Sequence, residues 1–298
     1  MIWEVDGISV GHWSDPVART GCTVVLFEPS AVASGEVRGG APATHEFALL
    51  DPAATVDRID AVVLSGGSAF GLAATAGVGE WCEERGRGFP TLAGPVPIVV
   101  GMSLFDLIVG DPSVRPGPAQ GRSACDAAVG GGADEVPALG AVGAGCGATT
   151  SKWRGPDGMG PGGIVGAVQR DGDLVVAALV AVNAWGDVAG AGLDGEPWPE
   201  VDPPVDASST GPGGGPFTNT TIGVVATNAR LDKLGCHHLA RAAHDGLARA
   251  ITPPHSAVDG DAFVAAATAA VDAPQTLVRA LAVVAVDRAI RSLGSSDA

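Results

Sequence analysis

A threonine stands where a glycine- and proline-rich segment meets a strongly apolar run. Thr220 follows Asn219 and precedes the apolar stretch Ile222 to Ala226. Its hydroxyl could attack the carbonyl of Asn219, and hydrolysis of the resulting ester would free the α-amino group of Thr220. That amino group, with a reference pKa of about 7.7–8.0, would lie beside its own hydroxyl and could act as its general base. The alternative is purely structural, because a threonine that begins a strand after a loop is an ordinary feature.

The segment before this threonine has the composition of a loop. Residues 187–218 contain seven Gly, six Pro and six acidic residues, with no Lys or Arg. Ordering such a segment costs backbone entropy and buries little apolar area in return. We therefore predict a long, flexible surface loop, whose end could move away from Thr220 once the chain is cut.

The elements that must position Thr220 are short strands alternating with helices. Apolar, β-branched runs predict buried strands at residues 23–27, 61–65, 164–168, 174–182 and 221–227. Apolar residues at helical spacing predict helices at 68–85, 231–250 and 274–293. This mixture predicts an α/β fold with helices layered on sheets, and we expect residues 1–298 to form one domain.

Composition excludes several classes of partner. The net charge of −16 argues against nucleic acid or an anionic membrane, since both require clustered Lys and Arg. The longest apolar run, near Leu174 to Val182, is about half the roughly 20 residues that a membrane-spanning helix needs. The first residues do not resemble a secretory signal, and five cysteines without a CxxC motif indicate reduced thiols. We expect a cytoplasmic protein.

Three further motifs have more than one interpretation. The glycine-rich run that contains Gly66, Gly67 and Ser68 lacks the spacing and the lysine of a phosphate-binding loop, so it predicts a tight strand-to-helix turn that could also form a wall of the substrate pocket. The side chains of His237 and of its neighbours Cys236 and His238 would point about 100° apart on a helix, which argues against a shared metal ion. His255 precedes Asp259 by four residues and could contact the site. No motif indicates a cofactor.

Several segments together resemble the P1/S58 peptidase family, which includes the L-aminopeptidase/D-esterase, the β-peptidyl aminopeptidases and the nylon-oligomer endohydrolase. The residues that carry the resemblance are Gly7 to His12, Thr20 to Val25, Leu64 to Leu72, Val142 to Ala148 with Lys152, and Thr220 to Ala229. They cover nearly the whole chain. The resemblance implies a four-layer α-β-β-α sandwich, similar to the N-terminal-nucleophile hydrolases but with different connectivity. It also implies a homo-oligomer of cleaved pairs, in which residues 1–219 form the α chain and residues 220–298 the β chain.

The resemblance assigns roles to five residues. Thr220 matches the nucleophile, and Asp259 and Asp261 match two polar positions that orient its amino group and hydroxyl. The Asp-Asp pair follows the nylon-oligomer hydrolase pattern, not the Ser-Glu pair of the aminopeptidases. Asn183 matches an asparagine that stabilises the oxyanion or positions groups near the nucleophile, and Lys152 matches a lysine near the site. A charged lysine would offset the repulsion between the two carboxylates.

One departure concerns the oxyanion region. Some members use a tyrosine there and this chain contains none, so backbone amides can serve instead. The resemblance implies hydrolysis of small peptides, amino-acid amides or linear amide oligomers. Two alternatives stay open: an uncleaved binding or structural protein on the same fold, and an acyltransferase similar to the ornithine acetyltransferases.

Overall fold

The computed structural model describes residues 1–130, 136–188 and 219–294. Its main sheet has nine strands in the order β10-β11-β13-β15-β2-β4-β7-β3, with β1 paired to β2. These strands are β1 (Ile8–Asp15), β2 (Thr20–Val37), β3 (Thr44–His45), β4 (Arg58–Ser65), β7 (Val99–Ser103), β10 (Gly163–Asp171), β11 (Leu174–Asn183), β13 (Thr220–Ala229) and β15 (Ala262–Val271). The short pairs are β5 (Phe89–Thr91) with β6 (Gly94–Val96), β8 (Thr149–Thr150) with β9 (Gly160–Pro161), and β12 (Asp187–Val188) with β14 (Ile251–Thr252).

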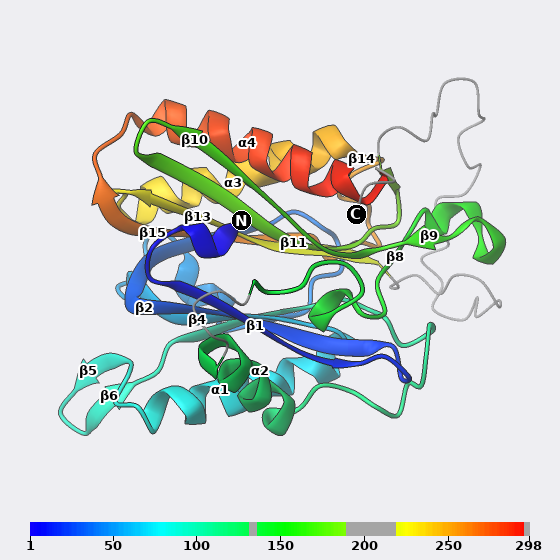
Figure 1. The fold of residues 1–298 in the computed structure, drawn as a ribbon, viewed down its shortest axis with the longest axis horizontal. Coiled ribbons are helices and arrows are strands. Elements are labelled where there is room, and N and C mark those ends of the chain that lie inside the picture. Colours follow the sequence, from blue (N-terminus) through cyan, green and yellow to red (C-terminus); the bar gives the residue numbers. More distant parts are fainter. Residues whose placement is uncertain (131–135, 189–218, 295–298) are drawn as a thin grey trace.

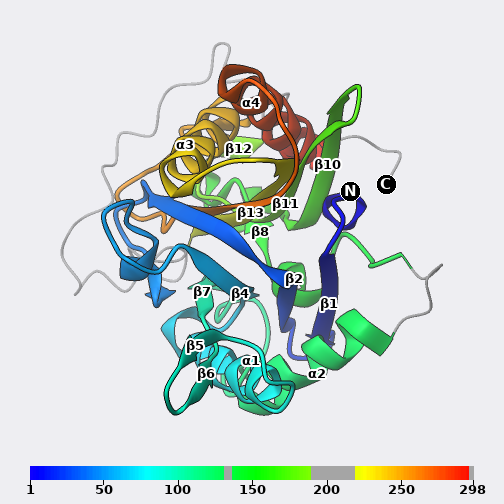
Figure 2. The same cartoon turned by 90° about the vertical axis from the view of Figure 1, so that its left-hand side faces the viewer.

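The helices pack in two pairs on opposite sides of the strands (Figures 1 and 2). They are α1 (Ala74–Glu83), α2 (Pro118–Gly130), α3 (Lys233–Ala250) and α4 (Gln275–Arg291). The 3-10 turns are η1 (Ile2–Glu4), η2 (Phe47–Leu50), η3 (Ser68–Ala73), η4 (Gly143–Gly145), η5 (Lys152–Arg154), η6 (Pro156–Gly158) and η7 (Ser292–Gly294). No helix among the described residues is long and apolar enough to cross a membrane.

The nine strands form one hydrogen-bonded sheet, but they lie in two layers because the long strand β2 passes from one layer into the other. Its pairing with β4 shifts register between Leu26 and Ala31, and its later residues, from Val32 on, pair with β15. The two halves of β2 therefore lie in different layers, with α3 and α4 outside one layer and α1 and α2 outside the other (Figure 2). This confirms the predicted α-β-β-α sandwich.

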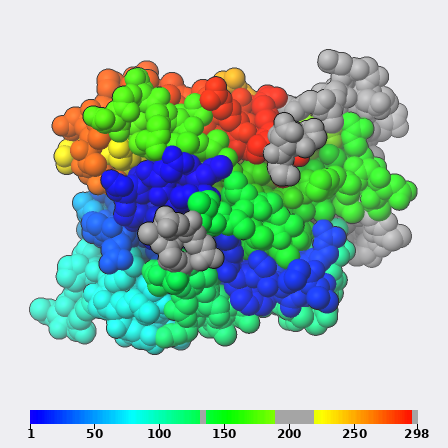
Figure 3. Space-filling view, viewed as in Figure 1, coloured from blue at the N-terminus to red at the C-terminus, as the bar shows by residue number. Residues whose placement is uncertain are grey.

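The strands at the centre are buried on both faces, which explains their uninterrupted apolar sequences. Side chains along a strand point alternately to opposite faces. In β13, Ile222, Val224 and Ala226 belong to the core between the two layers, whereas Val225 belongs to the core under α3 and α4. A third core lies under α1 and α2. At one edge of the inter-layer core, Ile2 of η1 packs against the other core residues. The N-terminal residues lie across the middle of the face seen in Figure 3.

The predicted elements are found with small changes of boundary. The predicted helix 68–85 begins as the 3-10 turn η3 and becomes α-helical only at Ala74. The helix predicted at 231–250 begins at Lys233, because the Asp232 side chain accepts the Gly235 N–H and caps it. The predicted loop 187–218 is described only at Asp187 and Val188, which form strand β12 and not loop; residues 189–218 lie outside the described part.

Candidate active site

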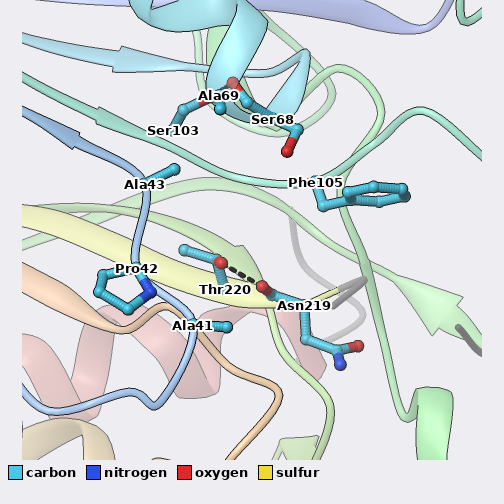
Figure 4. Close-up of a pocket in the computed structure, with 9 residues that line it drawn as sticks. All are labelled: Ala41, Pro42, Ala43, Ser68, Ala69, Ser103, Phe105, Asn219 and Thr220. Atoms are coloured by element: carbon cyan, nitrogen blue, oxygen red, sulfur yellow. Dashed lines mark hydrogen bonds between the residues drawn. The ribbon is translucent and has the colours of Figure 1, made fainter. Parts of the chain in front are cut away.

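Thr220 is the first residue of β13 and lies beside a pocket of about 280 Å³ (Figure 4). Thr220 is buried, yet it is one of the residues that line the pocket. The Thr220 hydroxyl donates to the carbonyl oxygen of Asn219 and accepts the Gly260 N–H at 3.2 Å. The other lining residues are Ala41, Pro42, Ala43, Ser68, Ala69, Ser103, Phe105 and Asn219. The hydroxyl thus lies next to both the peptide bond that precedes it and a space for a small molecule.

Asp261 is hydrogen-bonded to the residue after Thr220. Its Oδ1 accepts the backbone N–H of Thr221 at 2.7 Å. Its Oδ2 accepts the backbone N–H of His255 at 3.2 Å and faces the Nδ1 of the same histidine at 2.8 Å. Both oxygens are therefore occupied, and the carboxylate is held in one orientation.

Asp259 is equally enclosed but has different partners. Its Oδ1 accepts the Trp185 N–H at 3.2 Å, and its Oδ2 accepts the N–H and the hydroxyl of Ser256 at 3.2 and 2.5 Å. Burial, followed by the negative charge of Asp261, raises the pKa of Asp259 to about 7. Near neutral pH this carboxyl can exchange a proton, which is the property expected of a group in an acid–base site.

The segment after β2 holds the turn that contains both aspartates. The backbone N–H groups of Arg38 and Ala41 donate to the carbonyl oxygens of Asp261 and Asp259 at 2.9 and 2.8 Å. A Cβ added at Gly39 would lie 2.3 Å from the Asp261 nitrogen, so the two backbones approach too closely for any other residue. The nearby Ala41, Pro42 and Ala43 then continue as one wall of the pocket.

Asn183, on the strand beside Thr220, forms a buried pair with Lys152 of η5. Asn183 ends β11 and is the register partner of Thr220. Lys152 Nζ donates to Asn183 Oδ1 at 2.8 Å, to the Asn183 carbonyl at 3.0 Å and to the Thr149 carbonyl at 2.8 Å. The Asn183 amide nitrogen donates to the Phe105 carbonyl at 2.9 Å. The lysine thereby holds the side chain of Asn183, the residue paired with Thr220.

Lys152 is almost completely enclosed, and this changes its proton affinity. Burial lowers the pKa of Lys152 to about 7, although the negative charges of Asp259 and Asp106 act in the opposite direction. The site therefore contains a lysine and an aspartate whose pKa values have both moved towards neutrality. Each of these two groups can therefore change its protonation state near pH 7.

Of the predicted glycine-rich turn, only Ser68 lines the pocket. Gly66 and Gly67 instead contact Asp106: the Gly67 N–H donates to Asp106 Oδ1 at 2.7 Å, and a Cβ at Gly66 would lie 2.1 Å from Asp106 Oδ2. Asp106 also accepts the Thr20 hydroxyl at 2.7 Å, and its burial raises its pKa. Asp106 therefore anchors the turn that presents Ser68.

Sequence analysis missed Asp106 and most of the pocket wall. A lone acidic residue at the end of the apolar run 98–105 was the available signal for Asp106. Among the described residues, no group of three or more His, Cys, Asp or Glu is arranged to hold a metal ion.

Comparison with known proteins identifies the family of the chain. The family model of peptidase family S58 matches residues 1–295. The chain belongs to peptidase family S58. An S58 chain of this kind is an amide hydrolase, in agreement with the names of its relatives.

The relatives of this S58 peptidase include several bacterial proteins. An uncharacterized aminopeptidase of Mycobacterium leprae is 44% identical over 298 residues, which cover 92% of this chain and 80% of the relative. The 6-aminohexanoate-oligomer endohydrolase of Paenarthrobacter ureafaciens is 29% identical over 299 residues, covering 92% and 76%.

A solved structure shares the fold of this S58 peptidase. The L-aminopeptidase D-Ala-esterase/amidase of Ochrobactrum anthropi, described as a variant of the Ntn hydrolase fold, superposes with a TM-score of 0.68. It is 22% identical, and the match covers 98% of this chain and 85% of that one.

Proposed function

We propose that this S58 peptidase cleaves its own Asn219–Thr220 bond and then uses the new N-terminal Thr220 as the nucleophile that hydrolyses small amides. The observation that supports this most directly is the position of Thr220, which lines the pocket and whose hydroxyl contacts the carbonyl group of Asn219. Thr220 is the first residue of a rigid, buried strand, so its hydroxyl keeps this position when the preceding residue leaves.

Self-cleavage is an N-to-O acyl shift followed by hydrolysis. The Thr220 oxygen bonds to the Asn219 carbonyl carbon, the carbon–nitrogen bond breaks, and the proton of the hydroxyl passes to the departing nitrogen. Water then hydrolyses the ester, which leaves a carboxylate on Asn219 and restores the Thr220 hydroxyl. In turnover, the free amino group of Thr220 acts as the base for its own hydroxyl.

The surrounding groups have separate roles in this proposal. Asp261 and Asp259 orient the first residues of the new chain and bias the proton on its amino group. Asn183, held by Lys152, stabilises the oxyanion, an interaction whose loss elsewhere costs about 3 kcal/mol. The chain has no tyrosine, so the Gly260 N–H, which already reaches the Thr220 oxygen, is the backbone amide best placed to assist.

The substrate class follows from the pocket wall and the relatives. The lining side chains are small or apolar, and none of the described ones is charged, which suits small neutral acyl groups. We propose amino-acid amides, short peptides and linear amide oligomers as substrates. A homo-oligomer of cleaved pairs belongs to the same proposal. Five cysteines, all buried and unpaired, support a reducing compartment such as the cytoplasm.

Intact mass under denaturing conditions tests the proposal. Cleavage before Thr220 divides the 29.3 kDa chain into pieces of roughly 21 and 8 kDa, with threonine as the first residue of the smaller. Thr220→Ala should give a folded, uncleaved and inactive chain, and Thr220→Ser should still cleave because it keeps a hydroxyl.

The matched control is Thr221→Val. The Thr221 hydroxyl has no hydrogen-bond partner among the described residues, and the variant keeps the backbone N–H that binds Asp261. We expect normal cleavage in this variant. A wild-type chain that stays at 29.3 kDa after long incubation would instead favour an uncleaved binding protein. Acyl transfer to an added amine, without hydrolysis, would favour the acyltransferase alternative.

A further inference from the structure

His255 contacts both Asp261 of the proposed site and His244, a buried histidine of α3. Its backbone N–H and its ring Nδ1 both reach Asp261 Oδ2, at 3.2 and 2.8 Å. The residue has a φ of 52°, in the left-handed region, where His, Asn and Asp are more frequent than other side chains. The loop thus adopts an unfavourable backbone conformation at the residue whose ring contacts Asp261.

The contacts determine which ring nitrogen carries the proton. An ionised carboxylate only accepts hydrogen bonds, so the Nδ1 of His255 is the protonated nitrogen. The other nitrogen, Nε2, is buried and has no hydrogen-bond partner among the described residues. The ring therefore directs its one strong interaction at Asp261.

His244 of α3 lies against the other side of this ring. The two ring centroids are 4.9 Å apart in an edge-on arrangement, and Phe263 lies 5.1 Å from His244 on the neighbouring strand. The Nε2 of His244 donates to the Glu36 carbonyl at 2.9 Å. Burial lowers the pKa of His244 to about 3, so it is neutral near pH 7 and forms an uncharged wall.

We propose that His255 is a positioning residue of the hydrolase: its Nδ1–H holds one oxygen of Asp261, so that the other oxygen stays on the Thr221 N–H beside the nucleophile. This rests on the proposed function of Thr220. Without the ring N–H, the Asp261 carboxylate keeps only backbone N–H donors and can rotate away from Thr221.

The contact also affects where a proton resides. Asp261 lies close to Asp259, and two adjacent carboxylates do not ionise independently. Burial and the charge of Asp261 raise the pKa of Asp259, so a displacement of the Asp261 carboxylate also changes the proton affinity of Asp259. The charged and titratable groups around His255 are Asp261 and Asp259 on its own loop, His244 on α3, and Arg38, whose charge acts on His244.

A matched pair of variants isolates this hydrogen bond. In His255→Asn the amide nitrogen occupies nearly the place of Nδ1, and asparagine tolerates the left-handed conformation. In His255→Gln the amide group reaches the place of Nε2, so the donor to Asp261 is lost while a polar side chain remains. His238→Asn, on α3 but without a contact to Asp261 in the structure, controls for the loss of a histidine.

The assay measures the self-cleavage rate by intact mass, and kcat and KM against pH on an amino-acid p-nitroanilide. We expect His255→Gln to lower kcat about 10- to 100-fold, as for loss of a hydrogen bond to a charged group. KM should not change, because His255 does not line the pocket. The acid limb of the kcat profile should also shift, since the pKa of Asp259 depends on the charge of the neighbouring Asp261 carboxylate. His255→Asn should recover most of the activity and the wild-type limb.

The outcomes separate this inference from the function on which it rests. If the wild type cleaves and needs Thr220, but His255→Gln and His255→Asn have equal kcat and equal acid limbs, His255 does not position Asp261. If the wild type is never cleaved, both proposals are overturned. Thermal unfolding checks that each variant is folded, and His255→Ala, which also lacks the donor, replaces His255→Gln if that variant does not fold.

Discussion

Gly260 lies so close to the Thr220 hydroxyl that a side chain does not fit between them. A Cβ added at Gly260 would lie 2.6 Å from Thr220 Oγ1, 2.7 Å from the Ala41 carbonyl oxygen and 3.2 Å from the Pro42 Cα. Favourable contacts of a carbon begin at about 3.5 Å, so the hydroxyl or the turn would have to move by roughly 0.9 Å. Misplacement of a reacting group by about 1 Å costs on the order of 100-fold in rate.

We therefore expect Gly260→Ala to slow both self-cleavage and turnover about 100-fold. The overpacked turn should also lower the free energy of unfolding by about 1–3 kcal/mol. The cleavage rate is measured by intact mass on freshly synthesised chain, turnover by p-nitroanilide hydrolysis, and stability by urea unfolding.

Gly79→Ala is the matched control for this prediction. Gly79 lies inside α1, and a Cβ there has no atom within 4 Å. We expect unchanged activity and a gain in stability of up to about 1 kcal/mol, because alanine favours a helix over glycine. If Gly260→Ala cleaved itself and turned over at wild-type rates, the close approach of Gly260 to Thr220 would not matter for the chemistry, and the reasoning would be refuted.

Two further variants test the electrostatics around the site. Burial holds the pKa of Lys152 near 7, below its ordinary 10.5. Above pH 7 the unfolded chain therefore binds a proton at Lys152 that the folded chain does not bind. The contribution of Lys152 to the free energy of unfolding rises with pH as a result. Between pH 7 and about 8.5, the free energy of unfolding of the wild type, measured by urea unfolding, should rise by up to about 2 kcal/mol relative to that of Lys152→Met. A difference between the two proteins that stayed constant with pH would contradict this pKa. Arg154→Ala leaves the Asp187 carboxylate buried without its bidentate partner and should lower the free energy of unfolding by about 3 kcal/mol. Arg230→Ala breaks the exposed pair Arg230–Asp272 and should change the free energy of unfolding by less than about 1 kcal/mol. Equal effects of the two variants would refute a structural role for Arg154 at β12.

The success of strand prediction has a simple physical cause. Strands such as β11 and β13 are covered on both faces, so β11 is apolar up to its last residue and β13 contains the apolar run Ile222 to Ala226, and these runs stand out in the sequence. The helix α2 was missed because its buried positions, Gly121, Ala124 and Cys125, are small and produce little hydrophobic periodicity. The full length of β2 was missed because the charged and proline residues at its middle, Glu28 and Pro29, are typical of a strand end.

Some residues of the candidate site could likewise be predicted from the sequence, and others could not. Thr220 was singled out by its position between a loop and a strand, and the family resemblance predicted it as the nucleophile, just as a short motif matched to the family predicted Asp259 and Asp261. The contact of His255 with Asp261 was only a possibility at the level of sequence. The anchoring role of Asp106 was not predicted, since its partners Thr20 and Gly67 are 86 and 39 residues away along the chain.

The amino-acid sequence by itself determined the chemistry that the chain can offer: a hydroxyl at a loop–strand junction, two carboxylates two residues apart, and motifs that resemble one peptidase family. Only the tertiary structure decided which of these groups meet. It pairs Asn183 with Thr220 across neighbouring strands, encloses Lys152 beside Asn183, and brings Gly260 against the Thr220 hydroxyl. The physical reason is that enclosure and close contact depend on packing between distant segments, and the same enclosure moves the pKa values of Lys152 and Asp259 towards neutrality.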